Sequence, residues 1–157
     1  NNKVILGITD IPALDERYVG YSKLSYKIVK NKKTVLKVSK NKKLGESILN
    51  TTSPYVFANK NDQKCFERLG KKVKSIRLGG DCYSYCLLAD GLVDIVVESG
   101  LKPWDIRALV PIIKNAGGVI STWESETVVN GGRIIATTNK ELFRKIQKIL
   151  KTKKPSR

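Results

Sequence analysis

The sequence predicts an α/β protein, and three observations lead to that prediction. After residue 44, short apolar runs alternate with helix-length segments. Two of those segments, 105–116 and 139–150, repeat apolar side chains every three or four residues, which is typical of a helix with one buried face. Before residue 44, runs rich in β-branched and aromatic residues follow one another without a helical segment, which favours antiparallel strands. The expected units are antiparallel strands over 1–43, an α/β unit over 44–152 and a basic tail over 153–157.

The N-terminal part is expected to be a meander of four strands. Its first run, Val4-Ile5-Leu6, is continuous and apolar, so we expect a buried strand that Asp10-Ile11-Pro12 ends. Asn31-Lys32-Lys33 is expected to form the turn before the last strand, and a Lys-rich link from Lys40 to Lys43 ends the meander. The expected strands cover 3–9, 16–21, 25–30 and 34–38.

The C-terminal part is expected to alternate strands with four helices. We expect Asp62 to cap the first helix, Gly79-Gly80-Asp81 to open the second and Asn139 to cap the last, because short polar side chains and glycine favour helix starts. Gly91 is expected to end the second helix and Gly117-Gly118 the third. The expected strands cover 47–51, 73–78, 92–97, 119–122 and 133–137, and the expected helices cover 63–71, 81–89, 105–116 and 139–150.

The composition excludes several classes of function. The 157 residues include no His, which excludes Ser-His triads, His general bases and His-ligated zinc. Cys65, Cys82 and Cys86 form no Cys-x-x-Cys pair, so we expect reduced thiols in a cytoplasmic protein and no zinc ribbon. No run reaches the ~18 apolar residues that span a bilayer, so no membrane contact is expected. The sequence lacks Met and opens on an apolar run, from which we expect that an N-terminal portion is missing.

The net charge of +16 is distributed unevenly along the chain. Residues 1–78 carry a net +12, residues 140–157 a net +7, and the middle, 79–139, a net −3. A basic chain suggests nucleic-acid binding, but 23 of the 30 basic residues are Lys and only 7 are Arg, the side chain that dominates recognition of phosphates and bases. The lysines are scattered, so a solvated surface is the favoured interpretation. The acidic middle is more informative, because carboxylates gather where cations are held.

Three groups of polar residues are candidates for chemistry. Asp105 lies at a helix start, where a carboxylate either caps the helix or serves as a hard oxygen ligand for Mg²⁺. Glu98 ends an apolar run, and it is either a solvated strand end or part of a ligand site at the carboxyl end of a sheet. Gly79-Gly80-Asp81 precedes a helix whose first N–H groups can bind an anion or a polar ligand, although any strand-to-helix turn has this pattern.

Several of these motifs resemble the inositol monophosphatase family. Trp104-Asp105, Ala108 and Ala116-Gly117-Gly118 resemble its C-terminal motif. The resemblance runs from about residue 3 to residue 150 and is closest to the histidinol-phosphatase branch. The matching segments are Gly7-Ile8-Thr9-Asp10-Ile11-Pro12, Glu16-Arg17-Tyr18-Val19-Gly20, Thr52-Ser53-Pro54, Gly79-Gly80-Asp81-Cys82-Tyr83 and Leu101-Lys102-Pro103.

This resemblance implies a fold, an activity and a set of site residues. The fold is the C-terminal portion of a layered αβαβα architecture, with 1–43 as the end of an N-terminal α+β domain. The activity is that of a Mg²⁺-dependent phosphomonoesterase, of the histidinol-phosphate or inositol-phosphate type, with Asp105 as a metal ligand. Glu98 is implied to contact the non-phosphate part of a small phosphorylated metabolite. A cationic amine suits the pair of Asp81 and Glu98 better than a neutral polyol does. The residues implied to bind substrate are Gly80, Asp81, Cys82 and Glu98.

Two departures from the family pattern limit what this chain is expected to do alone. The family's other metal ligands lie in a Gly-Glu-containing segment and an Asp-Pro-x-Asp-Gly-Thr segment, and we find neither segment here. Arg107 stands two positions after Asp105, where a cation opposes Mg²⁺. We therefore expect an inactive chain that forms a homo-oligomer or pairs with a missing N-terminal half. The alternatives are a non-catalytic remnant or oligomerisation module and, less favoured, a basic nucleic-acid-binding protein.

Overall fold

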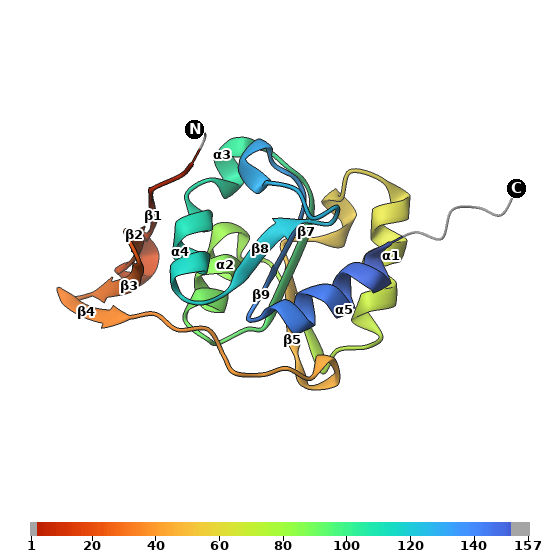
Figure 1. Ribbon diagram of the computed structural model, residues 1–157, viewed down its shortest axis with the longest axis horizontal. Helices are drawn as coiled ribbons and strands as arrows, with labels where there is room; N and C mark the ends of the chain where they lie inside the picture. Colours follow the sequence, from red (N-terminus) through yellow and green to blue (C-terminus); the bar gives the residue numbers. More distant parts are fainter. Residues whose placement is uncertain (1–2, 152–157) are drawn as a thin grey trace, which may run out of the picture.

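The computed structural model describes residues 3–151 and contains two β-sheets (Figure 1). The N-terminal sheet has the strand order β1-β2-β3-β4, and every neighbouring pair is antiparallel, which confirms the predicted meander. Its strands are β1 (Leu6–Ile11), β2 (Glu16–Tyr21), β3 (Leu24–Val29) and β4 (Lys32–Val35).

The boundaries of the first and last strands differ from their predictions. Strand β1 continues through Asp10 and Ile11, because both residues still pair with β2, and the chain turns only at Pro12. The turn before β4 lies at Lys30-Asn31, where both residues have positive φ. Asn tolerates this backbone conformation better than most residues do, so β4 begins earlier than predicted, at Lys32, and ends earlier, at Val35.

The prediction that the first strand is buried is wrong. Leu6 and Ile8 are 47% and 50% exposed, whereas Gly7 and Thr9 point into the protein. A Cβ atom added to Gly7 would lie 1.8 Å from the carbonyl oxygen of Ala108. The inner face of this strand therefore carries small residues because a helix backbone lies directly against it.

The second sheet has the strand order β6-β5-β7-β9-β8. Strand β5 runs parallel to β6 and β7, and β9 runs antiparallel to β7 and β8. This mixture of crossovers and one antiparallel strand fits the predicted α/β layer. The strands are β5 (Ile48–Thr51), β6 (Ser75–Leu78), β7 (Ile95–Leu101), β8 (Val119–Thr122) and β9 (Gly132–Thr137).

The helices form two layers, one on each face of the second sheet. Figure 1 shows α2 and α4 between the two sheets, and α1 and α5 side by side on the far face of the second sheet. The resulting order of layers is sheet, helices, sheet, helices. The helices are α1 (Lys60–Gly70), α2 (Asp81–Ala89), α3 (Pro103–Ile106), α4 (Leu109–Asn115) and α5 (Lys140–Leu150).

Two helix starts differ from their predictions and one is confirmed. Asn59, not Asp62, caps α1, and its side chain accepts a hydrogen bond from the Asp62 N–H at 2.9 Å. Asp62 is instead fully buried within the first turn. The helix predicted from Asp105 consists of two short helices, α3 and α4. Asn139 caps α5 as predicted, by accepting from the Leu142 N–H at 3.0 Å.

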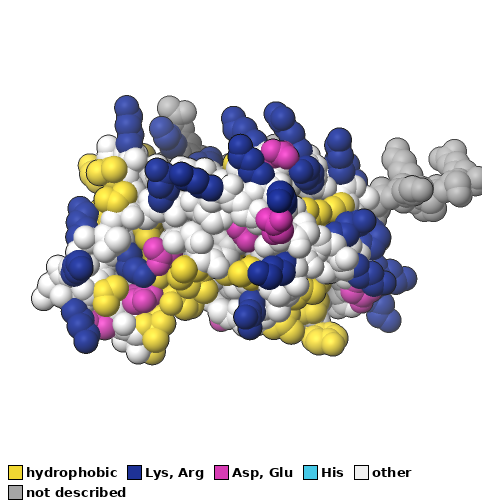
Figure 2. Space-filling model, turned by 90° about the horizontal axis from the view of Figure 1, so that it is seen from below, with side chains coloured by type: hydrophobic (Ala, Val, Ile, Leu, Met, Phe, Trp, Pro, Cys, Tyr) yellow, Lys and Arg dark blue, Asp and Glu magenta, His cyan; other side chains and the backbone are white. Residues whose placement is uncertain are grey.

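The surface carries its positive charge in scattered positions. Figure 2 shows Lys and Arg side chains spread along the whole viewed face, from the N-terminal sheet at the left to α1 and α5 at the right. This pattern agrees with the interpretation of the lysines as a solvated surface. Between residues 3 and 151, no helix is long and apolar enough to cross a membrane. The basic tail predicted over 153–157 lies outside the described residues.

Candidate functional site

A cavity of about 500 Å³ opens at the carboxyl ends of the parallel strands β5 and β7. This is the edge at which α/β sheets commonly bind ligands. Four of the five predicted site residues meet there, from three different elements. The lining residues are Thr52, Val56, Asp81, Cys82, Tyr85, Glu98, Ser99, Gly100, Leu101, Trp104 and Asp105.

Glu98 is buried, so its interpretation as a solvated strand end is wrong. It is 2% exposed, and its carboxylate accepts hydrogen bonds from the Thr52 N–H at 2.6 Å and the Thr51 hydroxyl at 3.2 Å. Burial raises the pKa of Glu98, and these hydrogen bonds offset part of that rise. Strand β7 does not end at Glu98 but continues to Leu101 after a register shift. The carboxylate is therefore held in one orientation toward the cavity.

Asp105 both caps a helix and lines the cavity. It is the third residue of α3, and its carboxylate accepts a hydrogen bond from the Lys102 N–H at 2.7 Å. Pro103 occupies the first helical position, where a backbone N–H would have no partner within the helix, so the lack of this N–H in proline does not destabilise α3. The side chain of Asp105 is exposed, as is that of Trp104 beside it. The helix-capping interpretation of Asp105 is therefore confirmed, and its placement at the cavity leaves an oxygen available to a ligand.

The turn at the start of α2 explains the position of Asp81. Gly79, Gly80 and Asp81 have φ values of 86°, 103° and 40°, so three consecutive residues adopt the left-handed region that favours glycine. Asp81 is strained there, and such strain is often found at ligand sites. Gly80 is the N-cap residue of α2 and does not line the cavity. It was predicted to bind substrate, and the structure shows it shaping the turn that carries Asp81.

Cys82 lies at the cavity with an exposed side chain. Partial desolvation of the sulfur by the surrounding protein and the neighbouring Asp81 carboxylate raise the pKa of its thiol. A raised pKa keeps the thiol protonated at neutral pH, and only the thiolate is a good nucleophile. Cys82 is thus placed to contact a ligand but not to attack one.

The described residues do not complete a metal site. Between residues 3 and 151, no group of three or more Cys, Asp and Glu side chains is arranged to hold a metal ion. The exposed carboxylate of Asp105 is the type of oxygen ligand that Mg²⁺ takes, but the described residues do not supply the further ligands of such a site. The guanidinium of Arg107 donates to the Val129 carbonyl at 2.7 Å and lies outside the cavity lining.

Sequence reasoning missed Tyr85 and Thr52 as cavity residues. Tyr85 follows Asp81 by four positions on α2, so the helical period alone places the two residues on one face. That spacing is the signal that could have identified it. Thr52 lies in a segment that resembles the family, but its residue type does not reveal its role, because it contributes a backbone N–H, which any residue except proline carries.

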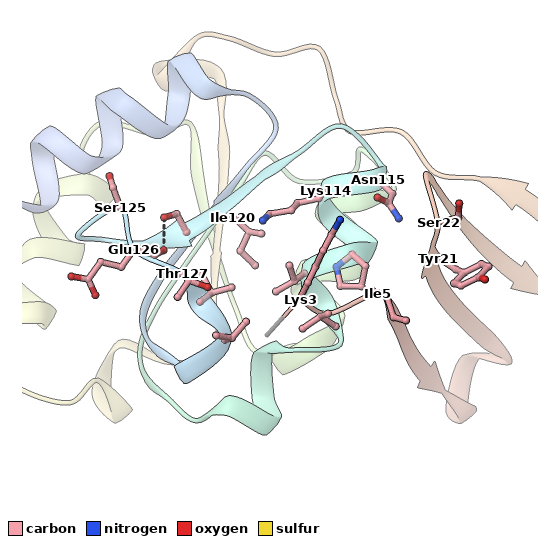
Figure 3. A pocket seen from close by; sticks show the side chains of 16 residues that line it. Lys3, Ile5, Tyr21, Ser22, Lys114, Asn115, Ile120, Ser125, Glu126 and Thr127 are labelled. Carbon is pink, nitrogen blue, oxygen red and sulfur yellow. Dashed lines mark hydrogen bonds between the residues drawn. The ribbon is translucent and has the colours of Figure 1, made fainter. Parts of the chain in front are cut away.

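A larger hollow, of about 860 Å³, lies between the N-terminal sheet and β8. Figure 3 shows Lys3, Tyr21, Lys114 and Glu126 around it, from both sides of the molecule. None of the predicted site residues lines this hollow. Glu126 is the one carboxylate among the described residues that line this hollow, whereas the smaller cavity gathers carboxylates from three elements, so we place the candidate site in the smaller cavity.

Comparison with known proteins identifies the family. The model of the family described as "Inositol monophosphatase family" matches residues 1–154. This chain belongs to the inositol monophosphatase family. Its α/β fold with two sheets is also that of an inositol monophosphatase from Zymomonas mobilis, with a TM-score of 0.86 and 35% identity over 93% of this chain and 57% of that one.

Two curated relatives of the family are named as phosphatases. The "Bifunctional phosphatase IMPL2, chloroplastic" of Arabidopsis thaliana is 44% identical over 121 residues, which are 77% of this chain and 34% of the relative. The "Histidinol-phosphatase" of Mycobacterium tuberculosis is 33% identical over 102 residues, 65% of this chain and 39% of the relative. The chain thus spans a little over a third of the length of each of these relatives.

Proposed function

We propose that this chain forms the substrate-binding part of a Mg²⁺-dependent phosphomonoesterase that acts on an amino-alcohol phosphate of the histidinol-phosphate type. The observation that carries this proposal is the convergence of Asp81, Glu98 and Asp105 on one cavity, in which no Lys or Arg stands among the lining residues that the structure describes. The names of the two curated relatives support the reaction class.

The charge of the cavity determines what it can hold. Three carboxylates without a cationic side chain repel a phosphate group, so the phosphate needs a metal ion between itself and the protein. Mg²⁺ bound at Asp105, together with ligands from outside the described residues, would polarise the phosphoryl group and activate water. The remaining two carboxylates, Asp81 and Glu98, then face the non-phosphate part of the substrate.

An ammonium group is the best partner for Asp81 and Glu98. Hydrogen bonds from Thr51 and Thr52 already hold the Glu98 carboxylate in place, so its side chain loses little conformational entropy when a cation binds. Asp81 is exposed and can approach the same cation from the start of α2. Inositol phosphate offers only hydroxyl groups to these carboxylates, whereas an amino-alcohol phosphate offers a positive charge. An amino-alcohol phosphate is therefore expected to bind in this cavity more tightly than inositol phosphate does.

The test compares two substrates in the complete polypeptide that contains this chain. Glu98→Gln and Asp81→Asn should each raise the KM for histidinol phosphate by about tenfold, because each removes a charge-assisted hydrogen bond. The KM for inositol phosphate should change much less. Glu126→Gln, at the other hollow, serves as a matched control and should leave both values unchanged. Equal increases for both substrates in the two cavity variants would contradict the assignment of an amine to this cavity.

A pH profile provides a second readout of Glu98. Burial raises the pKa of Glu98, so its carboxyl takes up a proton at a higher pH than an ordinary Glu does. The KM for histidinol phosphate should therefore rise as the pH falls through this raised pKa. In Glu98→Gln the acid limb should disappear from the profile. An acid limb that persists unchanged in this variant would show that another group causes it.

A further inference from the structure

The hydroxyl group of Tyr85 is buried without a partner in the protein. Tyr85 is 2% exposed, and within residues 3–151 no group forms a hydrogen bond with its hydroxyl oxygen. The residue lines the cavity that also contains Asp81, Glu98 and Asp105. Buried polar groups in proteins are nearly always hydrogen-bonded. An unpaired buried hydroxyl on a residue that lines the cavity therefore points to a partner that enters the cavity.

The neighbouring tyrosines of the same core show that the fold satisfies hydroxyl groups where it can. Tyr18 donates to the Glu16 carboxylate at 2.6 Å, and Tyr83 donates to the same carboxylate at 3.2 Å. Tyr83 is on α2 with Tyr85, two positions earlier, and points toward the N-terminal sheet. The difference between Tyr83 and Tyr85 is that only Tyr85 faces the cavity.

The surroundings of Tyr85 define the kind of partner it can take. Burial and the carboxylates of Glu98 and Asp105 raise the pKa of Tyr85 well above its ordinary value, so the hydroxyl keeps its proton and is a donor. An anionic acceptor is disfavoured, because the lining already holds three carboxylates and no Lys or Arg. The partner is therefore a neutral acceptor atom, such as a ring nitrogen or an oxygen.

We propose that Tyr85 is a ligand-contacting residue, whose hydroxyl donates a hydrogen bond to a neutral acceptor atom of an amino alcohol held through its ammonium group by Asp81 and Glu98. This inference rests on the proposed function and restricts its substrate class to amino alcohols that also carry a neutral hydrogen-bond acceptor. The cavity selects ligands that carry an ammonium group and a neutral acceptor a few bonds apart. Histidinol, with an amine and an imidazole ring, has both.

Calorimetric titration of the complete polypeptide with histidinol tests this role. Tyr85→Phe should weaken histidinol binding by about five- to tenfold, the effect of losing one hydrogen bond to a ligand. Its melting temperature without ligand should be unchanged or higher, because the variant removes an unpaired buried hydroxyl. Tyr83→Phe is the matched control: it removes a hydroxyl that donates to Glu16, so it should lower the melting temperature and leave histidinol affinity unchanged.

The possible outcomes separate this inference from the proposed function. Wild-type histidinol affinity in Tyr85→Phe would overturn the inference. So would a loss of Mg²⁺ affinity in that variant that matches its loss of histidinol affinity, because the hydroxyl would then serve the metal site. A wild-type polypeptide that neither binds histidinol nor hydrolyses its phosphate would instead refute the proposed function, whatever the variants do.

Discussion

The two sheets of this chain differ in how many of their faces are covered. The second sheet has helices on both faces, and Ile95, Val96 and Val97 of its central strand β7 are fully buried. The N-terminal sheet has helices on one face only, and Leu6 and Leu24 on the other face are 47% and 57% exposed. An apolar run in the sequence therefore does not by itself determine that a strand is buried. The candidate site lies in the unit around the second sheet, which helices cover on both faces.

The largest expected effect comes from the buried carboxylate of Asp62 in the covered unit. Asp62 is fully buried between Arg133, at 3.1 Å, and the Ser99 hydroxyl, at 2.5 Å. Asp62→Ala removes the charge-assisted hydrogen bonds from Ser99 and Arg133 and leaves the buried Ser99 hydroxyl without its acceptor, and we expect a loss of about 4 kcal/mol in the free energy of unfolding. Chemical denaturation measures this loss.

The matched control for Asp62 lies on the N-terminal sheet. Asp10 pairs with Arg17 at 2.9 Å, but both side chains are about half exposed. Asp10→Ala should leave the denaturation midpoint unchanged, because solvent screens an exposed pair. Similar losses in the two variants would remove the energetic difference between the two regions.

The next effect concerns the contact that holds the N-terminal sheet to α4. A Cβ atom on Gly20 would lie 2.4 Å from the backbone nitrogen of Ile112, and a backbone atom cannot move aside. Gly20→Ala should cost about 3 kcal/mol. Amide exchange should rise mainly in β1 to β3, while β7 and β9 keep their protection. Gly45→Ala, where nothing lies within 4 Å, should have no such effect, and equal exchange in both sheets of Gly20→Ala would show that they unfold as one unit.

The smallest effect on stability should accompany a clear effect on association. The outer face of the N-terminal sheet presents exposed apolar side chains in two cross-strand rows, and such a patch favours association. Light scattering should find the chain as an oligomer. Ile8→Lys should shift it toward the monomer, with a change in stability within about 0.5 kcal/mol, since Ile8 is half exposed. A monomeric wild-type chain would contradict this. The exposed residues are Leu6, Ile8, Tyr21, Leu24 and Val35.

The sequence predicted the covered unit better than the N-terminal sheet, for a physical reason. In the covered unit, α1 and α5 each have one apolar face that packs against the second sheet, so local pattern and burial agree there. In β1 the apolar residues Leu6 and Ile8 face outward, and Gly7 faces α4. No local pattern reveals that a helix backbone lies against a glycine.

The candidate site was predicted in part. The parts that were missed depend on three-dimensional packing, which local sequence does not reveal. Glu98 and Asp105 were found because carboxylates at element ends are conspicuous in sequence, and the resemblance to the family supported them. Gly80 is implied to bind substrate by its resemblance to the family's Gly-Gly-Asp turn, whereas in this structure it is the N-cap of α2 and does not line the cavity. Tyr85 was overlooked because its role depends on an unpaired hydroxyl, which only three-dimensional packing reveals.

The measurement that tests the central claim most directly is a hydrolysis assay of the chain alone and with a complementing polypeptide. The claim is that Asp105 is one ligand of a metal site completed by residues outside this part of the chain. With Mg²⁺ and histidinol phosphate, we expect no turnover by the chain alone, and activity after addition of a polypeptide that carries the family's Gly-Glu-containing and Asp-Pro-x-Asp-Gly-Thr segments. Asp105→Asn should abolish that restored activity. Mg²⁺-dependent turnover by the chain alone, or restored activity that survives Asp105→Asn, would contradict the account.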